Sequence, residues 1–169
     1  KMIKDEEVAY VDIRFTDPRG KLQHVTVLED QVDEDFLSEG FMFDGSSIAG
    51  WKSIDQSDMK LMPDLSTAYM DPFFAEKTLC LHCTVVEPDT NEPYERDPRS
   101  TALKAEAYLK SSGIGDASYW GPEAEFFVFD DVRYQVEMNK VAFEVDAADA
   151  SWNTDTRFEA GNMGHRPGV

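Results

Sequence analysis

The chain has 169 residues, 41% of them hydrophobic, which is enough for one compact domain or two small ones around an apolar core. Its 34 acidic and 16 basic residues give a formal net charge of −18, which disfavours nucleic acid and anionic membranes as partners because both require clustered basic charge. No apolar stretch approaches the roughly 20 residues that span a bilayer, and the start lacks a secretory signal, so we expect a cytoplasmic protein.

A β-hairpin is predicted at the start of the chain. Hydrophobic residues alternate strictly from Val8 to Phe15, which is typical of a strand with one buried face. Pro18 and Gly20 then favour a turn, and a second strand is expected around residues 22–27.

A short helix and further strands are predicted next. Residues 33–40 carry acids in the first turn and end on glycine, which favours a helix. Strand-like runs follow near Lys60, Ala68 and Leu79.

A polar, glycine-flanked loop lies between this helix and the next strand, in FMFDGSSIAGW (residues 41–51). Apolar anchors on both sides would hold the loop while its tip stays accessible. Asp44 can bind a small cation or accept a proton, with Ser47 orienting the same group. An ordinary Asp-Gly turn is the alternative.

The only two cysteines, Cys80 and Cys83, form a C-x-x-C pattern within a predicted strand over residues 78–86. Successive side chains of a strand point to opposite faces, so this odd spacing separates the thiols and prevents a shared metal or a disulfide. We interpret both cysteines, and His82, as packing residues.

Residues 87–98 are interpreted as a linker, because three prolines and six charged residues in twelve do not suit a central strand. We place a domain boundary here, which divides the chain into residues 1–94 and 95–169.

A helix is predicted after the linker. Asp97 and Pro98 suit its cap and first position, and Gly113 suits a stop after Ser112. Several alanines on one side of the helix would allow it to dock closely on a sheet.

A strand over residues 118–129 carries the sharpest anomaly, because Glu123 and Glu125 share a face of a segment that otherwise reads as buried on both faces. Two buried carboxylates require a cation or basic partners. Carboxylate oxygens are ligands that suit Mg²⁺ or Mn²⁺. The alternative to a buried pair is an edge strand with both glutamates in water.

A hairpin is predicted over residues 132–146, and a glycine-rich end follows it. In that end, His165 and Arg166 suit an anionic substrate.

Five segments together resemble, in order and spacing, the amino-terminal part of bacterial type I glutamine synthetase: FDGSSIAGW, DMKLMPD, RDPRS, GPEAEFFVFDD and GNMGHRPGV. The resemblance implies an α+β chain, with a β-grasp amino-terminal domain followed by the start of a larger α/β catalytic domain. The family's chain is much longer, so we expect this one to be roughly its first third.

The resemblance also implies chemistry and partners. Glu123 and Glu125 match two metal-binding glutamates, for two Mg²⁺ or Mn²⁺ ions per site, with ATP as co-substrate. Asp44 matches the aspartate that binds ammonium across a subunit interface, with Ser47 beside it. The implied reaction joins ammonia to L-glutamate through γ-glutamyl phosphate, in a homo-oligomer of two hexameric rings with active sites between subunits.

Three positions depart from the family pattern, namely Ala124 for proline, Met163 for lysine and Ala160 for glycine.

The sequence leaves two other functions open. One is a γ-glutamyl ligase of the same superfamily that acts on a polyamine, and the other is a non-catalytic β-grasp binding module.

Overall fold

The computed structural model describes residues 1–155, so the glycine-rich end with His165 and Arg166, and the departures at Ala160 and Met163, lie outside the described residues. The chain divides into two compact units, the first spanning Lys1–Tyr119 and the second beginning at Trp120. Each is described by itself.

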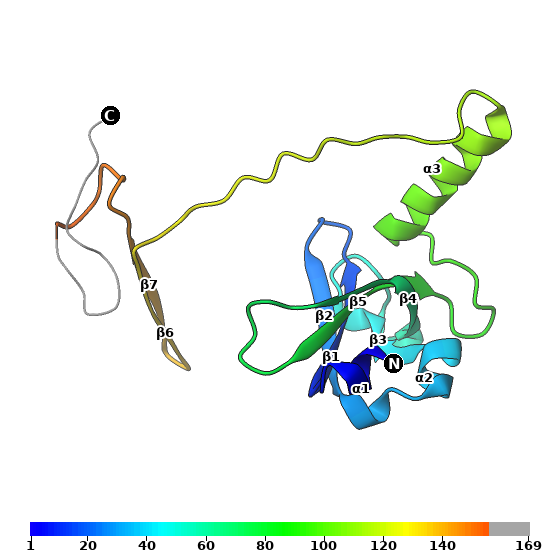
Figure 1. Cartoon of the computed structure of the whole chain (residues 1–169), viewed down its shortest axis with the longest axis horizontal. Coiled ribbons are helices and arrows are strands. Elements are labelled where there is room, and N and C mark those ends of the chain that lie inside the picture. The colour runs from blue at the N-terminus through cyan, green and yellow to red at the C-terminus, as the bar shows by residue number, and fades with distance from the viewer. Residues whose placement is uncertain (156–169) are drawn as a thin grey trace. The chain divides into compact units, whose positions relative to one another are not determined.

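The first unit is built on a five-stranded mixed sheet with the strand order β2-β1-β5-β4-β3 (Figure 1). The predicted hairpin is confirmed, since β1 pairs antiparallel with β2, and β1 also pairs in parallel with β5. β4 joins β5 to β3 by antiparallel pairing. The strands are β1 (Tyr10–Thr16), β2 (Leu22–Leu28), β3 (Phe41–Asp44), β4 (Asp58–Met70) and β5 (Thr78–Val86).

One short helix precedes the strands, and other short helical elements connect them. They are α1 (Met2–Asp5), α2 (Glu34–Glu39), and the 3-10 turns η1 (Glu29–Gln31), η2 (Gly45–Ser47) and η3 (Ile54–Gln56). α2 confirms the predicted short helix: the Asp33 side chain accepts a hydrogen bond from the Phe36 N–H at 2.8 Å, and Gly40 ends the helix with a φ of 82°.

The hydrophobic core lies on one face of the sheet. Val11, Ile13 and Phe15 of β1 are buried there, which confirms the alternation of this strand. Met59 and Leu61 of β4 join them. Burial of apolar surface is the main favourable term in folding, so this face holds the unit together.

The opposite face carries a buried ionic network centred on Arg14. Its guanidinium lies 2.7 Å from both Asp12 and Asp71, and Asp12 is 1% exposed. Asp12 also contacts the His24 ring and the Thr26 hydroxyl, each at 2.7 Å. These partners compensate for the burial of the carboxylate.

The two cysteines lie on opposite faces of β5, as predicted. Cys83 belongs to the hydrophobic core, whereas the Cys80 sulfur lies 3.8 Å from Asp71 in the ionic network. Both are buried free cysteines. Burial raises the pKa of both thiols, that of Cys83 to about 12, so both are neutral.

α3 (Pro98–Ser112) confirms the predicted helix and both of its ends. The Asp97 carboxylate caps the Arg99 and Ser100 N–H groups, and Gly113 is left-handed with a φ of 72°. The predicted close docking on a sheet is wrong for the described residues, because only Ser100 of the helix is buried. Its alanine-rich side faces solvent.

The predicted strand over residues 118–129 is also wrong. This segment has no regular secondary structure, and its large side chains are exposed, with Phe126 at 81%. An isolated strand leaves its backbone groups unpaired, and within residues 1–155 no neighbouring strand pairs with this segment.

The second unit contains the predicted second hairpin. β6 (Asp131–Glu137) and β7 (Lys140–Asp146) pair antiparallel in continuous register. Buried Asp146 accepts hydrogen bonds from the Asn153 side chain at 3.1 Å and from the Thr154 N–H at 3.2 Å, which fixes the turn after β7.

Candidate functional site

Asp44 stands at the end of an edge strand, where the backbone leaves the sheet. β3 pairs with β4 up to Asp44 opposite Asp58, and the Gly45 N–H then donates to the Ser57 carbonyl at 2.7 Å. The chain continues into the 3-10 turn η2. The pairing of β3 with β4 therefore fixes the backbone position of Asp44 where the loop begins.

Gly45 is required at the next position by close packing. A Cβ on this residue would lie 2.4 Å from the Met59 sulfur and 2.7 Å from its Cγ. Atoms that are not bonded to one another do not approach this closely, so the Met59 side chain or the loop would have to move. Met59 is fully buried in the core. The loop thus lies directly on the core beneath it.

The Asp44 carboxylate is held by the residue two positions further on. Ser46 donates to Asp44 Oδ1 twice, from its N–H at 2.8 Å and from its hydroxyl at 2.6 Å. These bonds, with a further contribution from the Ser57 side chain, lower the pKa of Asp44. Asp44 and Ser47 are both exposed, so the loop presents an oriented anion to solvent.

An aromatic cluster anchors the far side of this loop, as predicted for its apolar residues. The Trp51 ring lies 5.5 Å from Phe15 and 6.1 Å from Phe43, and it packs edge-on against Tyr94 at 5.5 Å. Ile48 is buried beside them. The loop is therefore attached to the core at both ends, and its tip lies between these two attachments.

The segment interpreted as a linker is ordered against this same loop. Arg96 Nη1 donates to the Gly50 carbonyl at 2.7 Å, and Lys52 Nζ lies 2.9 Å from both carboxylate oxygens of Glu87. The Lys52 ammonium also lies 5.2 Å from the centre of the Tyr94 ring. These contacts join residues far apart in the chain, so no local sequence pattern predicts them.

Glu123 and Glu125 lie in the irregular segment before β6, and both are exposed. Of the two alternatives, burial of the pair is wrong, because the strand that would bury them does not form, and both glutamates are open to water as in the other alternative, although not on an edge strand. Within residues 1–155, no three His, Cys, Asp or Glu side chains are grouped so that they could hold a metal ion. Their carboxylates are the ligand type that Mg²⁺ and Mn²⁺ prefer, but two such residues do not complete a coordination shell.

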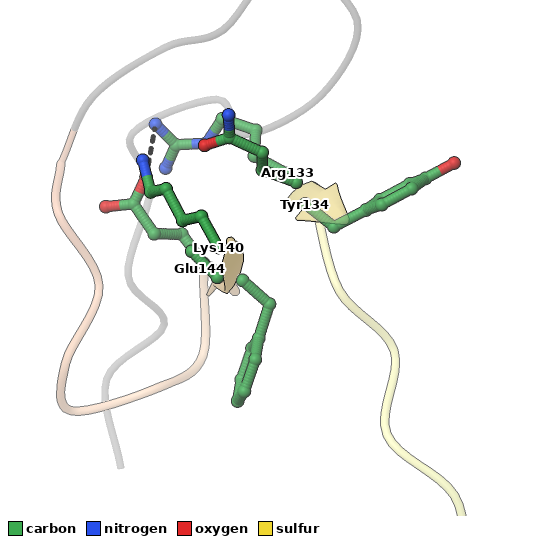
Figure 2. Close-up of a pocket in the computed structure, with 7 residues that line it drawn as sticks. Arg133, Tyr134, Lys140 and Glu144 are labelled. Atoms are coloured by element: carbon green, nitrogen blue, oxygen red, sulfur yellow. Dashed lines mark ion pairs between the residues drawn. The ribbon is translucent and has the colours of Figure 1, made fainter. Parts of the chain in front are cut away.

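A separate open cavity of about 380 Å³ lies along the β6–β7 hairpin (Figure 2). The side chains of Arg133, Lys140 and Glu144 gather on one side, and Tyr134 points away from them. Arg133 and Glu144 form an ion pair at 3.5 Å.

No helix within residues 1–155 combines the length and apolar character needed to cross a bilayer.

Two family models match consecutive parts of the chain. The glutamine synthetase β-grasp domain matches residues 7–88, and the glutamine synthetase catalytic domain matches residues 95–166. Together they account for nearly the whole sequence.

Curated relatives match over the same extent. The chain is 72% identical over 168 residues to a glutamine synthetase of Cereibacter sphaeroides and 58% identical over 169 residues to that of Rhizobium meliloti. These matches cover 99% and 100% of this chain. The chain spans 36% of the length of each relative.

Solved structures share the fold at low sequence identity. A glutamine synthetase of Plasmodium falciparum superposes with a TM-score of 0.65 at 23% identity, over 86% of this chain and 28% of that one. A complex of GmaS with ADP superposes with a TM-score of 0.59 at 19% identity, over 66% of this chain and 25% of that one. The sheet with its exposed Asp44 loop, the consecutive match to both domains and the identity to bacterial relatives lead to one conclusion: the chain belongs to the glutamine synthetase family.

Proposed function

We propose that this chain forms part of an enzyme that ligates ammonia to L-glutamate at the expense of ATP and yields L-glutamine. The observation that carries the proposal is the exposed Asp44 carboxylate, oriented by Ser46 on a loop fixed to the core at both ends. The 72% identity to a bacterial glutamine synthetase supports the same reaction. A polyamine-directed ligase and a non-catalytic module are not favoured by these relatives.

Asp44 supplies the ammonium subsite in this proposal. The Asp44 carboxylate is anionic at neutral pH, as aspartate ordinarily is, and attracts ammonium by charge. The hydrogen bonds from Ser46 lower its pKa further and so favour the charged form. The carboxylate then accepts one proton from ammonium and releases ammonia. Such a transfer requires that water be excluded when the complete site closes, because a solvated carboxylate is a weak base. Ser47, exposed beside Asp44, would orient the bound ammonium.

The remaining chemistry follows the order of bonds made and broken. The γ-carboxylate of glutamate attacks the terminal phosphorus of ATP, which gives γ-glutamyl phosphate and ADP. Ammonia attacks the γ-carbonyl carbon, and the carbon–oxygen bond to phosphate breaks as the carbon–nitrogen bond forms. The nitrogen loses one proton, which leaves with the phosphate, and the amide of glutamine results. Positioning and charge neutralisation provide most of the catalysis in reactions of this kind.

Glu123 and Glu125 would hold two divalent ions, Mg²⁺ or Mn²⁺. Such ions neutralise the converging negative charges of the nucleotide phosphates and glutamate. Carboxylate donors suit these ions, and the rest of the coordination would come from substrate, water and further protein ligands. Ala124 between the two glutamates retains a backbone N–H that the proline usual in the family lacks.

We further propose a cytoplasmic homo-oligomer of two hexameric rings, in which Asp44 of one subunit serves the active site of its neighbour. Its exposure is consistent with a role at a subunit interface. We place the domain boundary between residues 94 and 95. The family matches support this position, since the first ends at residue 88 and the second begins at residue 95.

The proposal is tested by assaying the complete native polypeptide that carries these residues. Purified protein is incubated with glutamate, ATP, Mg²⁺ and ¹⁵N-ammonium, and the products are identified by mass spectrometry. We expect ¹⁵N in the side-chain amide of glutamine, with one ADP and one phosphate formed per glutamine. Product formation with putrescine but not with ammonium would contradict the proposal, as would the absence of any amide product.

A further inference from the structure

We propose that Arg96 is a positioning residue for the ammonium subsite, because it fastens the loop that carries Asp44 to the segment that leads into α3. The inference rests on the proposed role of Asp44 and adds a residue outside the loop on which that role depends. All residues involved belong to the first compact unit.

The contacts of Arg96 are with the backbone of the loop. Its Nη1 donates to the Gly50 carbonyl at 2.7 Å and approaches the Trp51 carbonyl at 3.4 Å. Both carbonyls lie where the loop returns to the core. Arg96 Nε also lies 3.8 Å from its neighbour Glu95, and its side chain is 55% exposed. The guanidinium therefore acts as a bridge between two backbone segments.

The segment that presents Arg96 is itself rigidly held. Tyr94 is buried, its N–H donates to the Val85 carbonyl at 2.9 Å, and Pro93 forms an isolated bridge with Val86. The Tyr94 ring packs against Trp51. Arg96 is thus attached to β5, a central strand of the sheet.

The residue after Arg96 extends this support to the helix. Asp97 is fully buried, and its carboxylate accepts hydrogen bonds from the Val85 N–H at 3.2 Å and from the Ser100 hydroxyl at 2.6 Å. The beginning of α3, β5 and the Asp44 loop therefore share one continuous set of hydrogen bonds, with Arg96 as its link to the loop.

Loss of this link should affect the step that uses the loop. Asp44 remains held by Ser46 and by strand pairing. The far side of its loop would lose its hydrogen bonds to Arg96 and would depend on the aromatic cluster, the hydrogen bonds within the loop and the Lys52–Glu87 ion pair. A loop that samples more positions presents its carboxylate less often in the geometry that binds ammonium. Glutamate and ATP do not bind through this loop in the proposed mechanism.

The experiment compares Arg96→Ala, Arg96→Lys and the control Arg19→Ala in the complete native polypeptide. Arg19 is an exposed arginine in the β1–β2 turn. We expect the KM for ammonium to rise about two- to tenfold in Arg96→Ala, the range that loss of one hydrogen bond can produce, with the KM for glutamate and for ATP unchanged. Arg96→Lys retains a positively charged donor group and should restore part of the loss. Arg19→Ala should match the wild type.

A second measurement does not depend on glutamine formation. The N–H groups of Ile48 and Trp51 donate to Gly45 and Ile48 within the loop, at 3.1 and 3.2 Å. Hydrogen exchange at these two amides should accelerate in Arg96→Ala and not in Arg19→Ala. This measurement also separates the two proposals. If the wild type forms no glutamine, the proposed function fails. If hydrogen exchange in Arg96→Ala is unchanged, the positioning role of Arg96 is overturned.

Two further outcomes would overturn the proposal for Arg96. One is an unchanged KM for ammonium in an active Arg96→Ala enzyme. The other is an equal rise in the KM for all three substrates, which would indicate a general structural defect. If Arg96→Ala does not fold, the comparison of Arg96→Lys with the wild type decides by the same criteria.

Discussion

Ser46 donates both its N–H and its hydroxyl to the same carboxylate oxygen of Asp44, at 2.8 and 2.6 Å. Two donors on one oxygen stabilise the charged form and fix the direction of the second oxygen. The sequence FDGSS places this pair on the first turn after a strand, where the loop is open to solvent.

Substitution Ser46→Ala should raise the pKa of Asp44 toward the ordinary value for aspartate, because the hydroxyl bond to the anion is lost while the N–H bond remains. NMR titration of the side-chain carboxyl carbon measures this directly. Ser66 makes the same pair of bonds to Asp64, at 3.0 and 2.6 Å, and so provides a matched control. Ser66→Ala should shift Asp64 alone, and an unchanged Asp44 titration in Ser46→Ala would contradict the assignment.

Substitution Gly45→Ala should destabilise the first unit, because the new Cβ would overlap the buried Met59 side chain. The expected loss is about 1–3 kcal/mol in the free energy of unfolding, measured by urea titration. Gly115→Ala is the control, since a Cβ there approaches no atom closer than 3.5 Å. Equal stability of the two variants would show that the loop does not rest on the core as described.

Substitution Arg14→Met should leave Asp12 and Asp71 without their shared cation and lower the free energy of unfolding by about 3–5 kcal/mol at neutral pH. The exposed pair Lys77–Glu7, at 3.3 Å, gives the control, and Lys77→Met should cost at most about 1 kcal/mol. A comparable small loss in both variants would mean that the buried network adds little stability.

The same network predicts the direction of the pH dependence. Burial alone would raise the pKa of Asp12, but hydrogen bonds from Arg14, His24 and Thr26 outweigh it and lower that pKa. The stability that Asp12 contributes is therefore present above its unfolded pKa of about 4 and is lost as the pH falls through the lower folded value. Chemical unfolding between pH 7 and pH 2 should show this loss in the wild type and a smaller one in Asp12→Asn.

The two cysteines should be inert in the folded protein. Both thiols are buried with raised pKa values, so little thiolate forms at neutral pH. Iodoacetamide should label neither under native conditions and both after unfolding in urea, as counted by mass spectrometry. Rapid native labelling of Cys83 would contradict its place in the core.

Local patterns predicted the elements whose stability depends on near neighbours in sequence. The β1–β2 hairpin followed from alternation and a turn, and both ends of α3 followed from Asp97 and Gly113. The loop around Asp44 was also recognisable, since apolar anchors surrounded a polar tip. The turn of the hairpin and both ends of α3 depend on contacts within a few residues, whereas the residues that the apolar anchors of the loop contact, such as Tyr94, lie far away in the sequence.

Features that depend on distant partners were missed or misjudged. Arg14 and Asp12 alternate with the core residues, so sequence alone did not distinguish a solvated face from the buried network that Asp71 completes. Arg96 and Gly50 lie far apart in the chain, and no local pattern connects them. Segment 118–129 has the composition of a buried strand, but a strand forms only where neighbouring strands pair with it.

The role of Asp44 in binding ammonium is tested by measuring how glutamine formation depends on ammonium concentration. The wild type is compared with Asp44→Asn and with the exposed control Asp30→Asn. Asp44→Asn keeps the size of the side chain and removes its charge, so we expect the KM for ammonium to rise at least about tenfold, the scale of a lost charge-assisted hydrogen bond. The KM for glutamate and the affinity for Mn²⁺ should stay at the wild-type values, and Asp30→Asn should change none of the three. An unchanged KM for ammonium in Asp44→Asn would contradict the account.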